Sequence, residues 1–228
     1  MSTIADNILA LAARIDSAAK AAGRDPSTVR LLAVSKTKPS GAVREAYAAG
    51  VRDVGENYLQ EALAKQQELS DLALIWHFIG PIQSNKTRPI AEHFDWVHSV
   101  DRLKIAQRLC EQRPAGLAPL NVCLQVNVSG EASKSGCEPA DLPALAHAVC
   151  ALPGLRLRGL MAIPQPTDDR ASQEAAFARL RELQEGLGLD LDTLSMGMSH
   201  DLEAAIAQGA TWVRIGTALF GARDYGPV

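Results

Sequence analysis

Residues 31–40 read Leu-Leu-Ala-Val-Ser-Lys-Thr-Lys-Pro-Ser, a short apolar run that stops at a lysine and then turns. The run has the length and composition of a buried strand, and the helix-like segment 41–50 follows it. The same order, an apolar run and then a segment with helical spacing, recurs along the chain. Such alternation predicts parallel strands that are joined by helices.

Eight runs of this kind are expected to be strands. They span residues 31–36, 51–57, 75–80, 96–100, 121–128, 155–163, 193–199 and 212–216. The segments between them show helical spacing, for example residues 177–187, and residues 1–22 form one further amphipathic segment. The chain is therefore predicted to be an α/β protein, an eight-stranded parallel (β/α) barrel of the TIM type with an extra N-terminal helix.

The alternative architecture is an open, doubly wound sheet. Its dinucleotide-binding form carries Gly-x-Gly-x-x-Gly after the first strand, and this chain has no such motif there. No Pro/Gly/Ser-rich linker is long enough to separate two domains, and the proline-rich stretch 163–167 is expected to be a rim loop. Residues 1–228 are therefore expected to form a single domain.

Composition excludes several classes of function. Hydrophobic residues make up 47% of the chain and charged residues 21%, which is typical of a soluble globular protein. A net charge of −3 without a basic stripe argues against nucleic-acid binding. No apolar run is long enough for a membrane span or a signal peptide, so a cytoplasmic protein is expected. The four cysteines and five histidines show no ligand spacing, and no metal site is predicted.

Lys36 is the leading candidate for chemistry. Side chains alternate along a strand, so Leu32, Val34 and Lys36 are expected to share the face that lines the barrel. An ammonium group enclosed there must find a counter-charge or lose its proton, and a neutral amine is a nucleophile toward aldehydes. The alternative is a lysine that extends into solvent from the strand end. Lys38, just before Pro39, is expected to lie in an exposed loop.

Two strand-to-loop junctions near the C-terminus have the composition of a phosphate site. Ser199 ends the predicted seventh strand, and Gly216 and Thr217 end the eighth, where the loops of barrels often bind phosphate. Ser199 could instead cap the helix that begins after it. Arg214, within the eighth strand, needs a defined acceptor, either a carboxylate or a ligand ring atom. An amine together with a phosphate site indicates a phosphorylated aldehyde.

Five stretches carry a resemblance that extends over nearly the whole chain. They are residues 33–38, 55–57, 77–86, 195–199 and 214–221. In these stretches the chain resembles the pyridoxal phosphate homeostasis proteins, which are alanine-racemase-like barrels without the second domain of the racemases. The resemblance implies that pyridoxal 5'-phosphate (PLP) is held as a Schiff base on the lysine at position 36.

The resemblance also implies the remaining cofactor contacts. Asn57 would lie beside the cofactor and Met196 near its ring, while Arg214 would contact the ring nitrogen. The phosphate contacts would be the three residues named above, at positions 199, 216 and 217. No residue is assigned a catalytic role.

The function implied by the resemblance is intracellular PLP (vitamin B6) homeostasis and delivery, without established catalytic turnover. PLP-dependent apo-enzymes are then the expected recipients, and a monomer is expected. The alternative is a PLP-dependent racemase or lyase, but racemisation needs two acid–base groups on opposite faces of the substrate. None of Tyr47, Tyr58 and Tyr225 is expected to lie opposite Lys36. A barrel aldolase, with an imine to its substrate, is a third possibility.

Overall fold

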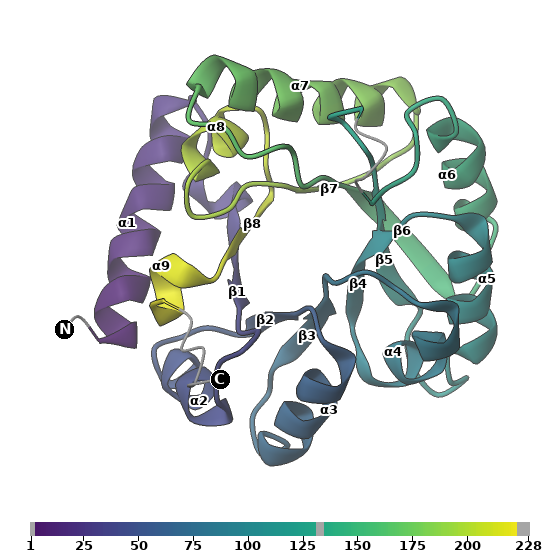
Figure 1. Cartoon of the computed structure of the whole chain (residues 1–228), viewed down its shortest axis with the longest axis horizontal. Helices are drawn as coiled ribbons and strands as arrows, with labels where there is room; N and C mark the ends of the chain where they lie inside the picture. Colours follow the sequence, from purple (N-terminus) through teal and green to yellow (C-terminus); the bar gives the residue numbers. More distant parts are fainter. Residues whose placement is uncertain (1–2, 131–134, 223–228) are drawn as a thin grey trace, which may run out of the picture.

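The computed structural model describes residues 3–130 and 135–222 of the chain. Eight parallel strands close into a barrel in chain order, and helices surround it (Figure 1). The strands are β1 Arg30–Val34, β2 Asp53–Glu56, β3 Ile75–Phe78, β4 Trp96–Val100, β5 Leu120–Gln125, β6 Leu155–Met161, β7 Thr193–Ser195 and β8 Trp212–Ile215. Pairing of β1 with β8, with Leu32 opposite Arg214, closes the barrel. The predicted eight-stranded barrel is confirmed.

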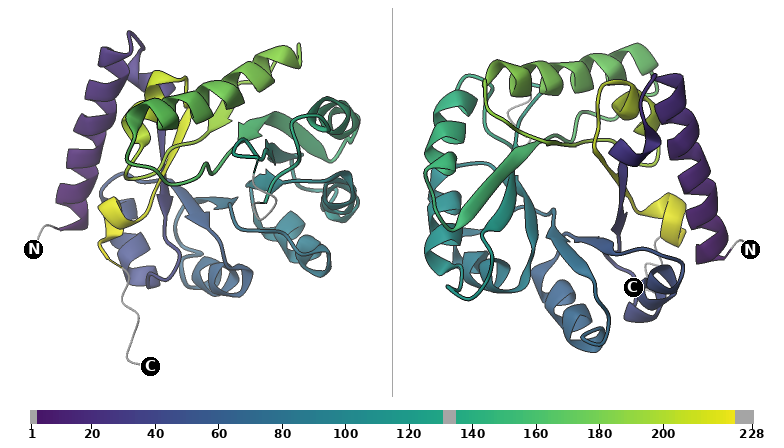
Figure 2. Two further views of the ribbon diagram at one scale, coloured as in Figure 1. Left: turned by 45° about the horizontal axis from the view of Figure 1, so that its top comes forward. Right: turned by 180° about the vertical axis from the view of Figure 1, so that it is seen from behind.

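Helices cover the outside of the barrel on every side, as both views of Figure 2 show. They are α1 Ile4–Ala21, α2 Ser40–Ala48, α3 Leu59–Glu68, α4 Thr87–His93, α5 Leu103–Gln112, α6 Leu142–Cys150, α7 Arg170–Gly186, α8 Leu202–Ala207 and α9 Thr217–Phe220. Short 3₁₀ turns lie at Pro26–Thr28 and Ser84–Lys86. Most of the apolar core lies between these helices and the outer face of the barrel.

The extra N-terminal helix, α1, is well defined by its sequence. Thr3 and Asp6 form a reciprocal capping box at its start. Leu11, Ile15 and Ala19, spaced four residues apart, make up its buried stripe. The helix packs against α8 and α9, beside the point where β8 meets β1 (Figure 1). The predicted extra helix is therefore present, and it lies next to the last two strand–helix units.

The barrel interior contains small apolar clusters that are separate from the main core. One consists of Leu32, Val34, Ile79 and Trp212, and another of Trp96, Cys123 and Met161. Leu32 and Val34 are alternate residues of β1, so the predicted inward face of this strand is confirmed. Aromatic rings also pack here, with His77 stacked on Trp96 at a centroid distance of 5.5 Å.

Every strand except β4 ends one to four residues earlier than the sequence pattern predicts. β1, β2 and β7 end at Val34, Glu56 and Ser195, so the candidate residues Lys36, Asn57 and Ser199 lie in the loops that follow. After β1 the chain turns at once, because the Lys38 N–H donates to the Ser35 carbonyl at 3.0 Å. An apolar run can continue past the last hydrogen bond between neighbouring strands. Its composition therefore overestimates the length of the strand.

The sequence pattern predicts neither a membrane span nor a metal site, and the structure bears on both for the residues that it describes. In residues 3–130 and 135–222, no helix is long and apolar enough to cross a membrane. The same residues contain no group of His, Cys, Asp and Glu side chains suited to a metal ion.

Candidate functional site

A cavity of about 280 Å³ lies where the loops after β1, β2, β7 and β8 converge. Its lining residues are Val34, Lys36, Asn57, Ile79, Ile163, Met198, Ser199, His200, Arg214, Gly216 and Thr217. Six of the seven candidate cofactor contacts are in this set. The seventh, Met196, is fully buried in the main core, and Met198 is the methionine that lines the cavity. Residues from opposite ends of the sequence therefore form one site.

Lys36 is half-buried at the edge of this cavity, next to the apolar side chains of Val34 and Ile79. Lys38 is also half-buried, which differs from the exposed loop position expected for it. Its Nζ donates to the carbonyl of Ala222, which holds the side chain beside the end of the barrel. Of the two lysines, Lys36 is the one that lines this cavity.

Asn57 presents an amide whose oxygen lacks a partner. Its Oδ1 is buried, and no hydrogen bond to it is found within the described residues. The backbone of Asn57 packs closely against Gly80, where only a glycine fits, because a Cβ at residue 80 would lie 2.2 Å from the Asn57 carbonyl oxygen. Buried polar atoms are normally hydrogen-bonded, so this oxygen fits a ligand that donates to it.

Arg214 is buried and is held by neutral acceptors. One terminal nitrogen donates to the Ser195 carbonyl at 2.5 Å and to its hydroxyl at 2.9 Å, and the other donates to the Ala162 carbonyl at 2.8 Å. Across the described residues, no carboxylate forms an ion pair with it, and the acceptors found for its guanidinium are groups of Ser195 and Ala162. Burial lowers the pKa of Arg214 to about 10, and the guanidinium stays charged at neutral pH. A guanidinium has five N–H groups, so donors remain for a ligand.

A chain of hydrogen bonds runs from Arg214 through the barrel interior. Because Ser195 Oγ accepts from Arg214, its proton is directed to His98 Nδ1 at 2.7 Å. His98 Nε2 then donates to His77 Nδ1 at 2.9 Å, and His77 Nε2 donates to Asp53 Oδ1 at 2.9 Å. Burial lowers the pKa of both histidines, which keeps the rings neutral. Inward-facing positions of β2, β3, β4 and β7 supply this chain, and sequence analysis did not identify it.

Acid is expected to destabilise the protein through these two histidines. In the unfolded chain each takes up a proton near its ordinary pKa of about 6.5, whereas burial keeps His77 and His98 neutral in the folded state. The unfolded state therefore binds more protons below about pH 6.5, and the free energy of unfolding falls as the pH falls. Urea unfolding at about pH 7.5 and about pH 5.5 measures this. His98→Gln should reduce the pH dependence, and replacement of the exposed His147 should not; an equal dependence in both variants would contradict the assignment.

Ser199 does not cap the following helix. The cap position of α8 belongs to Asp201, whose carboxylate accepts the Met198 N–H at 2.6 Å. The Ser199 hydroxyl instead faces the start of α9, where it accepts a long hydrogen bond of 3.4 Å from the Ala218 N–H. The loops after β7 and β8 therefore meet at this hydroxyl, as a phosphate site built from both would require.

The extra helix α1 supports both of these loops. Arg14 donates to the Ser199 carbonyl at 2.9 Å and forms an ion pair with Glu203 of α8. Asn7 donates through its side chain to the Leu219 carbonyl of α9 at 2.9 Å. One helix thus hydrogen-bonds to the segments after β7 and after β8. Sequence periodicity predicted the helix but not these contacts, because polar residues on its surface carry no signal of a partner.

These features define a class of protein: a (β/α) barrel with an amine after its first strand and a loop pair rich in hydroxyl groups and glycine after its last two. Comparison with known proteins agrees. The sequence profile of the family described as alanine racemase, N-terminal domain, matches residues 7–224. The alanine racemase of Corynebacterium glutamicum has the same fold at 18% identity and a TM-score of 0.65, with 93% of this chain and 61% of the racemase chain covered.

Two relatives are much more similar. The pyridoxal phosphate homeostasis protein of Pseudomonas aeruginosa is 82% identical over 226 residues, which cover 99% of this chain and 98% of the relative. PipY of Synechococcus elongatus, solved with PLP bound, is 44% identical with a TM-score of 0.85, and the match covers 96% of this chain and 100% of that chain. The chain belongs to the family of pyridoxal phosphate homeostasis proteins.

Proposed function

We propose that this protein binds PLP as a Schiff base on Lys36 and takes part in intracellular PLP homeostasis and delivery. The observation that carries the proposal is the cavity that gathers Lys36, Asn57, Arg214 and the loops after β7 and β8. The PLP-bound relative PipY supports the choice of cofactor. Single-domain organisation, a cytoplasmic location and a monomeric state belong to the same proposal.

The lining residues fit the chemistry of this cofactor. PLP would supply an aldehyde, with which a neutral amine on Lys36 would form a reversible imine and release water. Arg214, a donor that stays charged, would hold the ring nitrogen unprotonated and so weaken the ring as an electron sink. Asn57 Oδ1 would accept from a donor on the cofactor. Ser199, Gly216 and Thr217 would hold the phosphate.

Carrier function is favoured over catalysis because the cavity offers few candidates for a second acid–base group. Tyr58 is 55% exposed and is not among the residues that line the cavity, and Tyr47 belongs to α2 on the outside of the barrel. Tyr225 lies outside the described residues. His200 lines the cavity, and it follows Ser199 in the loop that is proposed to bind the phosphate. PLP-dependent racemisation or lyase activity is the alternative.

An absorbance spectrum of the purified protein with PLP tests the proposal. We expect a band near the violet edge of the visible range that borohydride abolishes, with peptide mapping placing the reduced adduct on Lys36. Incubation with L-alanine or L-serine should give no racemisation or elimination above that of free PLP. A colourless protein would refute PLP binding, and turnover above the free cofactor would favour the enzyme.

A further inference from the structure

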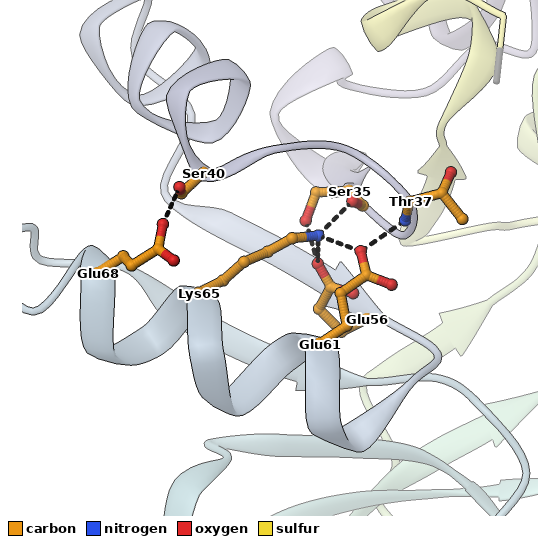
Figure 3. A network of polar contacts seen from close by, with 7 residues as sticks. All are labelled: Ser35, Thr37, Ser40, Glu56, Glu61, Lys65 and Glu68. Atoms are coloured by element: carbon orange, nitrogen blue, oxygen red, sulfur yellow. Dashed lines mark hydrogen bonds and ion pairs between the residues drawn. The ribbon is translucent and has the colours of Figure 1, made fainter. Parts of the chain in front are cut away.

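A network of buried and half-buried charges lies directly behind the loop that carries Lys36 (Figure 3). Lys65 of α3 is 5% exposed and donates to three oxygens. These are Glu56 Oε1 at 2.7 Å, Glu61 Oε1 at 2.6 Å and the Ser35 carbonyl at 2.6 Å. An ammonium has three N–H groups, so this side chain is fully satisfied and is held in one place.

The network contacts both peptide groups that flank the Cα of Lys36. The Ser35 carbonyl, which belongs to the preceding peptide, accepts from Lys65. The Thr37 N–H, which belongs to the following peptide, donates to Glu61 Oε1 at 2.6 Å. Glu61 and Lys65 are themselves an ion pair one helical turn apart on α3. The Glu61–Lys65 ion pair therefore holds both of the peptide groups that flank the Cα of Lys36.

The backbone that follows Lys36 needs such an anchor. Thr37 has φ 63°, and within residues 3–130 and 135–222 it is the one non-glycine residue with a positive φ. This left-handed conformation is unfavourable for a β-branched residue and persists only where surrounding contacts impose it. The hydrogen bond that the Thr37 N–H donates to the Glu61 carboxylate is such a contact. Strain of this kind at a binding site indicates that the loop conformation serves the ligand.

The most buried charge of the network, Glu56, also contacts the loop that carries Lys36. Glu56 is fully buried at the end of β2, and its Oε1 accepts from the Ser35 hydroxyl as well as from Lys65. Burial raises the pKa of Glu56, and the charge of Lys65 opposes that shift. Ser35, the residue before Lys36, is therefore held through its hydroxyl and its carbonyl together.

We infer that Glu61 and Lys65 are positioning residues, which hold the backbone of Lys36 in the orientation that directs its amine into the cavity. The inference rests on the proposed function for its link to PLP, but the backbone clamp itself exists without the cofactor. It assigns α3, which supplies no residue to the cavity lining, an indirect role in imine formation through the backbone of Lys36.

Glu61→Ala is the variant of choice, because Glu61 is partly exposed and its loss leaves the Lys65–Glu56 pair intact. Glu68→Ala is the matched control. Glu68 lies on the same helix and bonds the Ser40 hydroxyl, away from the peptides of Lys36 (Figure 3). Two measurements apply: amide hydrogen exchange of Thr37 in the PLP-free protein, and the rate of imine formation after mixing with PLP, followed by absorbance.

We expect Glu61→Ala to accelerate exchange of the Thr37 amide and to slow imine formation about tenfold, the scale of one lost charge-assisted hydrogen bond. Glu68→Ala should change neither. Glu61→Gln should keep part of the rate, because its amide oxygen can still accept from Thr37. Adding Thr37→Gly to Glu61→Ala should also restore part of it, because glycine adopts a positive φ without strain.

Unchanged exchange at Thr37, or an unchanged rate in Glu61→Ala, would overturn the inference. Absence of rescue by both Glu61→Gln and Thr37→Gly would do so as well, since loss of general stability predicts no such rescue. If the wild-type protein itself forms no imine on Lys36, the proposed function fails, and the exchange measurement in the PLP-free protein still decides whether the clamp exists.

Discussion

Replacement of Lys36 by alanine is expected to abolish the violet absorbance band and the adduct trapped by borohydride. Lys36 is the lysine that lines the candidate cofactor cavity, and an alanine cannot form an imine. Its side chain is half-buried at the end of the barrel and lies outside the apolar clusters, so the variant should remain folded. Titration with PLP, followed by borohydride reduction and mass spectrometry of peptides, measures the result.

Lys38→Ala provides the matched control for this experiment. Lys38 lies two residues away but is bonded to the Ala222 carbonyl, so its loss should leave the band in place. A trapped adduct on Lys38 in the Lys36→Ala protein would reassign the site. Persistence of the band without any lysine adduct would rule out a covalent link altogether.

Combined replacement of Ser199 and Thr217 by alanine is expected to produce the second large effect, a loss of cofactor affinity. Both residues line the end of the cavity that we propose binds the phosphate, one from each of the two loops that meet there. A hydrogen bond to a charged group contributes about 1.5–3 kcal/mol, so losing two weakens PLP binding by roughly 10² to 10⁴-fold. Equilibrium titration with PLP measures the dissociation constant directly.

Pyridoxal, which lacks the phosphate, separates this effect from general damage. Its weaker binding should be the same in the wild-type and doubly substituted proteins, because neither forms a phosphate contact with it. Ser17→Ala, an exposed substitution on α1, should change the affinity for neither compound. Unchanged PLP affinity in the double variant, or an equal loss for pyridoxal, would remove the phosphate assignment.

Local patterns were sufficient for much of the fold. Each strand run and each helical stripe is a property of neighbouring residues, and eight alternating units leave few topologies besides a closed parallel barrel. The position of Lys36 after the first strand and of Ser199 after the seventh then follows from the rule that sites lie at the carboxyl ends of the strands. Here the sequence was read correctly because the fold repeats one simple unit.

Other features of the site have no local signature. Met196 is buried in the core while Met198 lines the cavity, because the chain leaves β7 at Ser195 and turns at Gly197, which has φ 93°. The alternation of inward and outward side chains along a strand does not continue through such a turn, so it could not predict which methionine faces the cavity. The acceptors of Arg214 in the structure, the Ala162 and Ser195 carbonyls, could not be named from the sequence either, because they lie on other strand–loop units.

The sequence by itself determined the architecture, the amine and the residue types that surround it, because periodicity and strand-end position are encoded within a few consecutive residues. Only the tertiary structure decided which distant groups touch: Arg14 with Ser199, His98 with Ser195, and Lys65 with the peptide before Lys36. Those contacts join parts of the chain that are 30 to 185 residues apart. Closing the barrel brings them within hydrogen-bond distance, and no local pattern specifies such a pairing.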